Sequence, residues 1–264
     1  MRSSAADPGK KPRRLALAAG AALCLATLTS GARADGEAWQ QFEYRLPIVR
    51  TPRPEFPRLA ARVYAEAREA GRFDGLYDSF LRVGPLLWVS RFLFIGAHGT
   101  FQGTRTAGGC AQPAPAGCGQ YVFEFRGEIE PNFFGRLGPI TFNDRNRLEY
   151  RWRETGARGR YRNQLRINYQ PADWTIYPFV IDEILFDLKS EGFNQNRATA
   201  GVAFALSPST RLDLGYTFRS RLTVATAAAA ERWDHDHIAL VMLVVDVPAL
   251  EAPRQAPAPP TRLP

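Results

Sequence analysis

Long hydrophobic runs are nearly absent from this sequence of 264 residues. The longest run, Leu15 to Leu28, falls short of the ~20 apolar residues that a membrane-spanning helix needs. No window after residue 35 is long and apolar enough either. In the hydrocarbon core of a bilayer only helices and closed β-barrels satisfy every backbone hydrogen bond. If the mature protein enters a membrane, it must therefore do so as a barrel.

Lysine is also scarce, since Lys189 is the only lysine after residue 11. A soluble surface normally mixes lysine with the other charged residues, so this scarcity weakens the case for a soluble protein. The net charge is +8, but residues 1–34 hold six basic residues against Asp7, a charge of +5 that leaves only +3 for the remaining 230 residues. Such a small surplus gives no strong attraction to phosphate backbones, and we expect no nucleic-acid partner.

Cysteine occurs three times, and two of these residues, Cys110 and Cys118, lie in the turn-rich stretch "GGCAQPAPAGCGQ". No CxxC spacing is present, so a cysteine-based metal site is not expected. Disulfides persist in exported proteins, and we predict a Cys110–Cys118 disulfide in an exposed loop. The alternative is a pair of free thiols.

The amino terminus has the layout of a secretory signal peptide. A basic start ends at Arg14, the apolar run follows, and Ala32-Arg33-Ala34 offers small residues before a cleavage site. Cys24 lies within the run but lacks the preceding small residue of a lipoprotein signal. We therefore predict removal of residues 1–34; the alternative is an uncleaved membrane anchor.

Residues 35–247 show a period of two in most segments. In "YVFEFRGEIE", for example, the apolar residues Tyr121, Phe123, Phe125 and Ile129 alternate with charged ones. Successive side chains of a strand point to opposite faces, so this alternation predicts half-polar strands. We expect ten of them, near residues 39–48, 80–88, 92–101, 120–130, 140–153, 158–169, 175–188, 194–206, 210–219 and 236–247.

One segment, residues 58–73, is ambiguous. It alternates like a strand, yet its alanines after Pro57 also suit a helix. Counting it as a strand gives eleven and places the chain ends on opposite rims, whereas bacterial single-chain barrels favour even numbers. We therefore predict an all-β, antiparallel up-and-down transmembrane β-barrel of ten strands, with twelve as the alternative.

A soluble sandwich or lipocalin-like barrel also alternates, but with its apolar face inward. Three features favour a membrane barrel: the scarcity of lysine, the length of the segments, and Tyr and Trp near the segment ends. Connections also alternate between short and long, as in outer-membrane barrels with short periplasmic turns. We expect the outer membrane of a Gram-negative cell as the location, with its lipid and lipopolysaccharide and the barrel-assembly machinery as partners. Residues 248–264, rich in Pro and Ala, read as a disordered tail.

Several stretches, in order, resemble one bacterial family of outer-membrane barrels, the domain of unknown function DUF2490. They are "WQQFEYRLP" (39–47), "RYRNQLRINY" (160–169), "YPFVIDEILFDL" (177–188), "GFNQNRATAGVAFALSPSTRLDLGY" (192–216) and a final strand that begins at a histidine. The resemblance implies a β-barrel in the outer membrane and carries over no activity. One departure is that "HIALVMLVVDV" (237–247) lacks the terminal aromatic that helps assembly of such barrels.

The polar faces of the four consecutive segments between residues 120 and 188 should face the lumen side by side. They carry nearly equal numbers of arginines and acids, and arginine pairs with carboxylates through two parallel hydrogen bonds. We predict a lumen network of Glu124, Arg126, Glu128, Glu130, Arg147, Glu149, Arg151, Arg153, Arg160, Arg162, Arg166, Glu183 and Asp187. The network either fills and braces a narrow lumen or forms a charged constriction that binds or passes small anions.

An enzyme would need a nucleophile and a base. Outer-membrane lipid hydrolases use Ser with His, but no motif joins a serine of this chain to one of its three histidines. We therefore predict a non-enzymatic barrel without cofactor or metal, and keep a lipid-acting Ser/His enzyme as the alternative. "DHDH" (234–237) could hold a metal but reads better as a solvated strand start. The adjacent Asp182 and Glu183 should point to opposite faces and share no acid–base site.

Overall fold

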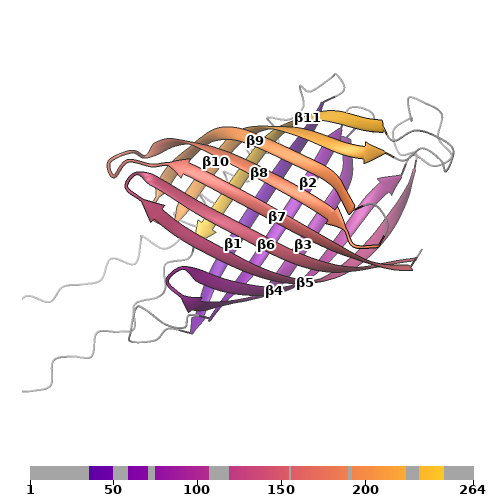
Figure 1. The fold of residues 1–264 in the computed structure, drawn as a ribbon, viewed down its shortest axis with the longest axis horizontal. Helices are drawn as coiled ribbons and strands as arrows, with labels where there is room; N and C mark the ends of the chain where they lie inside the picture. The colour runs from indigo at the N-terminus through magenta and orange to yellow at the C-terminus, as the bar shows by residue number, and fades with distance from the viewer. Residues whose placement is uncertain are drawn as a thin grey trace, which may run out of the picture.

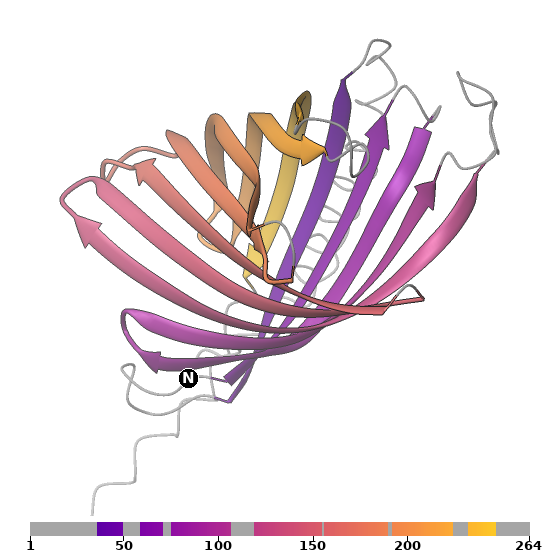
Figure 2. The ribbon, with the colours of Figure 1, turned by 45° about the vertical axis from the view of Figure 1, so that its right-hand side comes forward.

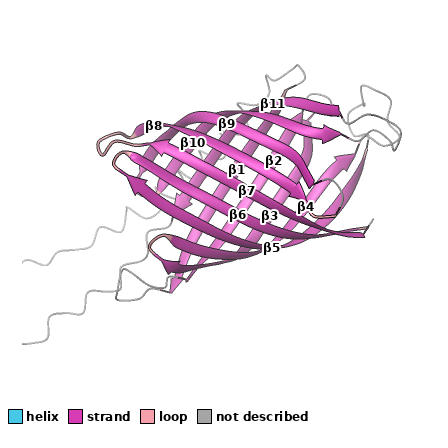
Figure 3. Ribbon diagram, viewed as in Figure 1, coloured by secondary structure: helices cyan, strands magenta, loops and turns pink. Residues whose placement is uncertain are grey.

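A computed structural model of the protein describes residues 36–49, 59–70, 75–106, 119–154, 156–189, 192–223 and 232–246. The described residues form eleven strands in one closed barrel (Figures 1 and 3). The strands are β1 (Glu37–Val49), β2 (Leu59–Ala70), β3 (Gly75–Ser90), β4 (Leu93–Thr106), β5 (Gln120–Leu137), β6 (Ile140–Arg153), β7 (Gly156–Tyr169), β8 (Ile176–Asp187), β9 (Gly192–Ser207), β10 (Thr210–Thr223) and β11 (Arg232–Asp246).

The all-β barrel predicted from the alternation is confirmed, but both strand counts, ten and twelve, are wrong. The ambiguous segment is strand β2, paired with β1 and with β3 over its length. Its polar alternate residues, Arg62, Glu66 and Arg68, are buried inside the barrel. Those side chains have partners only in the barrel interior, and this tertiary constraint overrides the helix propensity of the alanines.

Closure of the barrel follows from the odd strand number. Every sequential pair is antiparallel, but β1 and β11 run parallel, with register pairs from Glu37↔Ile238 to Arg45↔Asp246. In Figure 2 the last strand lies beside the first. The structure is therefore an up-and-down barrel closed by one parallel pair.

The two rims differ in their connections. We call the rim where β1 begins the N-terminal rim and the rim where β11 ends the C-terminal rim. Tight turns at residues 91–92, 138–139 and 208–209 join strands at the C-terminal rim, and Gly138 there has a positive φ of 57°, which favours glycine. At the N-terminal rim β4 ends at Thr106 and β5 begins at Gln120, and β10 ends at Thr223 and β11 begins at Arg232; residues 107–118 and 224–231 lie outside the described residues.

The two faces of the sheet are sorted by polarity. On β5 the charged residues Glu124, Arg126, Glu128 and Glu130 are buried in the interior, whereas Phe123, Phe125 and Ile129 are exposed on the outer surface. The lipocalin-like alternative requires the opposite orientation. The arginine–carboxylate face is therefore the inner face of the barrel.

Three expectations fall on residues outside the described ranges: the signal peptide (1–34), the Cys110–Cys118 disulfide and the tail (248–264). Within the part of the chain that the structure describes, no helix is long and apolar enough to cross a membrane.

The parallel closure can be tested by cross-linking. Tyr44 and Val245 are register partners on the outer face, so a Tyr44→Cys/Val245→Cys variant should form a β1–β11 disulfide. The background should carry serine at Cys24, Cys110 and Cys118, and the cross-link is read as a mobility shift on a non-reducing gel.

The control is Tyr44→Cys/Ala239→Cys. Those residues would be neighbours in an antiparallel closure, but the register Ala38↔Ala239 separates them by six residues along the strand, roughly 20 Å. A cross-link in the control pair and none in the first pair would contradict the parallel closure.

Candidate functional site: the charged lumen

Glu130 on β5 binds two arginines of the lumen that lie far apart in the sequence, Arg62 and Arg147. Its carboxylate accepts a hydrogen bond from Arg62 Nη1 at 2.7 Å and one from Arg147 Nε at 2.6 Å. Arg62 in turn donates to Glu43 on β1 at 2.7 Å, and Glu43 also pairs with Arg45 at 2.6 Å. These side chains thus link two pairs of neighbouring strands, β1–β2 and β5–β6. Arg62 on β2 reaches Glu130 on β5 although β2 and β5 are not neighbours in the sheet.

Glu149 on β6 is the most heavily shared carboxylate of the predicted set. Arg160 donates to it twice, at 2.6 and 2.8 Å, and Arg162 once, at 3.2 Å. Arg126 and Arg147 lie 3.7 Å from its oxygens. Its side chain is 0 % exposed, so this charge is compensated by arginines rather than by water.

Glu124 forms a second cluster nearer the N-terminal rim. Arg151 binds it through two hydrogen bonds of 2.6 and 2.8 Å, and Arg126 and Arg153 contact the same carboxylate. The bidentate geometry is the one that planar guanidinium groups prefer.

Glu183 on β8 continues the network toward β9. It pairs with Arg162 at 2.6 Å and Arg197 at 2.8 Å, and Arg145 lies 3.9 Å away. Farther toward the C-terminal rim, Asp213 is shared by Arg166 at 2.6 Å and Arg211 at 2.8 Å.

The structure therefore brings almost all the predicted residues together. Glu128 belongs to the network through Arg82, 2.7 Å away. Asp187 differs, because it ends β8 and accepts a hydrogen bond from the backbone N–H of Lys189 at 2.9 Å. Its described role is to close a turn.

The sequence analysis missed about half of the ion-paired side chains inside the barrel. They include Glu37, Glu43, Arg62, Glu66, Arg68, Asp78, Arg82, Arg145, Arg197, Arg211, Asp213, Arg219 and Asp236. The same alternation of polar and apolar residues marks most of them. Arg145 lies on the polar face of the segment 140–153, and the others lie outside the four segments between 120 and 188.

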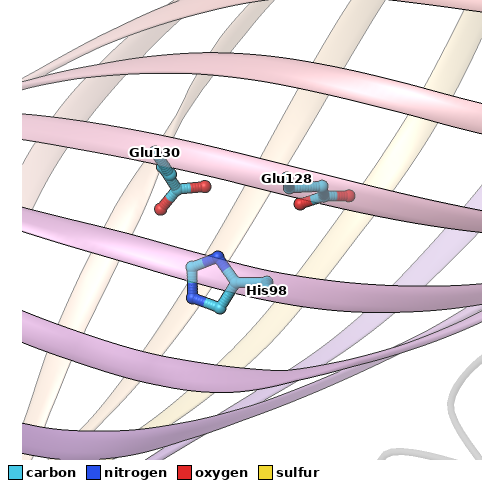
Figure 4. A group of neighbouring side chains, drawn as sticks. All are labelled: His98, Glu128 and Glu130. Carbon is cyan, nitrogen blue, oxygen red and sulfur yellow. The ribbon is translucent and has the colours of Figure 1, made fainter.

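His98 on β4 lies beside Glu128 and Glu130 of β5 (Figure 4), and their potential ligand atoms are within 4.8 Å of one another. Both ring nitrogens are buried without a hydrogen-bond partner among the described residues. However, Arg62, Arg82 and Arg147 already bind the two carboxylates. Three arginines against two glutamates leave a positive environment, which opposes a divalent cation, so these residues do not fit a metal centre.

A cavity of about 420 Å³ occupies the lumen beside this network. Its lining reaches Gly135 and Gln170, next to turns of the C-terminal rim, and extends to Trp39, Phe80 and Arg197 at its deep end. Glu124, Arg151 and Arg153, toward the N-terminal rim, do not belong to it. The lumen therefore holds an ion-paired cluster around Glu124 and, apart from it, a cavity that reaches the C-terminal rim.

The outer wall pairs a serine with a histidine. Ser220 on β10 and His235 on β11 are register partners, and the Ser220 Oγ–His235 Nδ1 distance is 3.1 Å. The "DHDH" stretch divides between the two faces: His235 and His237 are exposed, whereas Asp236 pairs with Arg219 at 2.7 Å. These four residues therefore do not converge on one metal site.

Asp182 and Glu183 point apart, as expected. Asp182 accepts a hydrogen bond from Asn196 on the exposed face, whereas Glu183 lies in the lumen. They form no joint acid–base pair.

We predict that Glu149→Gln destabilises the fold. The change leaves several buried arginines with one carboxylate fewer, and removing one partner of a buried ion pair typically costs about 3–5 kcal/mol. The urea midpoint of the refolded protein, followed by the mobility of the unheated band, should fall.

Glu154→Gln is the matched control, because Glu154 is exposed in the turn after β6. Such a surface change typically alters the free energy of unfolding by no more than about 0.5 kcal/mol. Equal midpoints for the two variants would mean that water, not arginine, compensates Glu149.

Three comparisons with known proteins bear on this barrel. The model of a family described as "Protein of unknown function (DUF2490)" matches residues 36–226, and this confirms the resemblance seen in the sequence. No curated protein and no solved structure matches the chain.

Proposed function

The chain belongs to the DUF2490 family of proteins of unknown function, and from that premise we propose that it is an outer-membrane β-barrel whose lumen is closed by its arginine–carboxylate network. In this proposal the barrel is non-enzymatic, and the network seals and braces it. Outer-membrane lipid and lipopolysaccharide surround it, and the barrel-assembly machinery inserts it after removal of residues 1–34.

The outer surface supports the membrane location. Large apolar side chains are exposed on most strands, for example Phe101, Phe123 and Phe125 on adjacent strands, each more than half exposed. So much exposed apolar surface is unfavourable in water but suits lipid contact. Trp152 lies near the N-terminal rim and Trp174 near the C-terminal rim, as aromatic girdles require.

The strand lengths agree with this location. The shortest strands, β2 and β8, have 12 residues, and a tilted strand needs about 9–11 residues to cross the hydrocarbon core.

One observation gives the main support for the proposal that the lumen is closed. The carboxylates of Glu124, Glu149 and Glu183, on three different strands, each bind at least two arginines, and the side chains of all three are at most 5 % exposed. Long side chains that interlock in this way leave little room for water and ions between them. Opening a path would separate buried ion pairs, which is costly.

The test uses protein purified from the outer-membrane fraction of an expressing cell. We expect the chain in that fraction, beginning at Asp35, and little or no current when it is inserted into a planar bilayer. The variant Glu124→Ala should increase the current, because it releases Arg126, Arg151 and Arg153 from their shared carboxylate. Glu154→Ala, in the exposed turn, is the control and should not.

Recovery of the protein from the soluble periplasmic fraction would contradict the membrane location. A large, steady conductance of the unmodified protein would contradict the closed lumen and indicate a porin.

The second candidate function, a lipid-acting Ser/His enzyme, rests on the Ser220–His235 contact at 3.1 Å on the outer wall. A catalytic base usually has a third group that orients it. The neighbours Asp234 and Asp236 do not serve here, because they bind Thr223 and Arg219. The contact therefore supplies a nucleophile and a base without the rest of a catalytic site.

We expect the purified protein to release no fatty acid from mixed phospholipid micelles. If a low rate is seen, Ser220→Ala should leave it unchanged, as should the control Ser209→Ala in a turn of the other rim. A rate abolished by Ser220→Ala and retained by Ser209→Ala would make the enzyme the first candidate.

A further inference from the structure

We propose that the lumen cavity of about 420 Å³ is a binding site for a small organic oxyanion, a molecule that carries a phosphate or carboxylate group. The site is reached from the C-terminal rim. This inference rests on the proposed function only for the side of entry, since the closed lumen blocks entry from the N-terminal rim. The affinity for the anion follows from the cavity itself.

The cavity is of suitable size and place. Its volume of about 420 Å³ lies within the ~300–1,000 Å³ of typical small-molecule sites. The residues around it come from all eleven strands, so the walls are held by the closed barrel rather than by loops.

The walls carry a surplus of positive charge. Ten arginines line the cavity against four acids: Arg45, Arg62, Arg68, Arg82, Arg145, Arg147, Arg162, Arg166, Arg197 and Arg211 against Glu43, Glu66, Glu183 and Asp213. Some of these arginines bind Asp78, Glu128, Glu130, Glu149 or Asp246, which do not line the cavity. Even with these five included, ten arginines face nine acids. A low-dielectric cavity with such a surplus attracts anions.

The surplus is concentrated where carboxylates are shared. Glu183 serves Arg162, Arg197 and Arg145, and Arg145 is the most distant of the three at 3.9 Å, beyond hydrogen-bond length. The guanidinium of Arg145 is thus held in the cavity wall with most of its donor capacity unused in the described contacts.

Arg166 adds a positioned donor. It is fixed by Asp213 at 2.6 Å and by Asn168 at 2.7 Å, and it lies 4.2 Å from the centre of the Phe179 ring. Its Nη2 atom is nevertheless buried without a hydrogen-bond partner among the described residues. A buried N–H of a charged group without an acceptor is unfavourable, and an oxyanion would relieve this.

Part of the lining is apolar. Phe94 and Phe134 are in ring contact at 5.2 Å on one side, and Leu240 and Met242 lie on β11. An inorganic ion would leave this surface uncovered. The combination fits a ligand with an anionic group and an apolar body, which is why we infer an organic anion rather than a free ion.

The experiment measures unfolding of the purified, refolded full-length protein with sodium phosphate, sodium benzoate or sodium chloride at equal ionic strength. We expect phosphate or benzoate, or both, to raise the unfolding midpoint more than chloride does. A response to phosphate alone assigns the site to phosphate compounds, and a response to benzoate alone assigns it to carboxylates. No response beyond that to chloride overturns the proposal.

The deciding variant is Arg145→Gln. It removes one member of the surplus, so it should unfold no earlier than the unmodified protein in chloride, whereas its affinity for the effective anion should fall about tenfold, the loss expected for one charge-assisted hydrogen bond. Arg136→Gln carries the same charge change on the exposed surface near the same rim and should keep the full response.

Equal anion responses in Arg145→Gln and Arg136→Gln would overturn the cavity as the site. Both readouts are independent of conductance. A protein that binds the anion and also conducts freely would refute the closed lumen while leaving the anion site intact.

Discussion

The structure depends on the pairing of arginine with carboxylate inside the barrel, where most of these side chains are buried. A buried charge without a partner costs several kcal/mol, and most inward charges are matched by an opposite charge on another strand or two residues along the same strand. Because arginine presents five donors on a rigid plane, one guanidinium can bind two carboxylates, as Arg62 does with Glu43 and Glu130. These shared contacts fix the strands in one arrangement around the lumen, and lysine, a point charge on a flexible chain, could not replace arginine there.

The cavity lies where apolar side chains interrupt the ion pairs. Around Glu124, arginines and the carboxylate bind one another closely, and this cluster does not line the cavity. In the cavity, aromatic and aliphatic side chains such as Phe94, Phe134 and Leu240 occupy part of the inner face. Apolar side chains cannot join the hydrogen-bonded network, so a hollow remains beside them.

Much of the fold could be predicted from the sequence, because the period of two is a local property of each segment. The polar faces of the segments between residues 120 and 188 could be identified for the same reason. Contacts between residues far apart in the sequence were missed. The pairing of Arg62 with Glu130, for example, spans 68 positions and depends on the closure of the barrel. The predicted strand count was wrong because the preference of bacterial barrels for even numbers excluded segment 58–73 as an eleventh strand. The alternation of Arg62, Glu66 and Arg68 in that segment was the correct signal. The strand expected to end near residue 130 continues to Leu137 through Pro131, since Pro131 lies in a gap of the β5–β6 ladder between Ile129 and Asn132, where its missing N–H costs no bond.

The parallel closure also determines the order in which the barrel can form. Ten of the eleven strand pairings join neighbours in sequence, so hairpins can assemble as the chain becomes available. The last pairing joins Glu37 to Ile238, across nearly the whole chain, and the Glu37–Arg219 ion pair spans 182 positions. Contacts of such high sequence separation form slowly. Until β11 arrives, β1 and β10 are edge strands with unpaired backbone groups, which are prone to pair with other chains. The interval before closure is therefore the stage at which this protein is most exposed to aggregation.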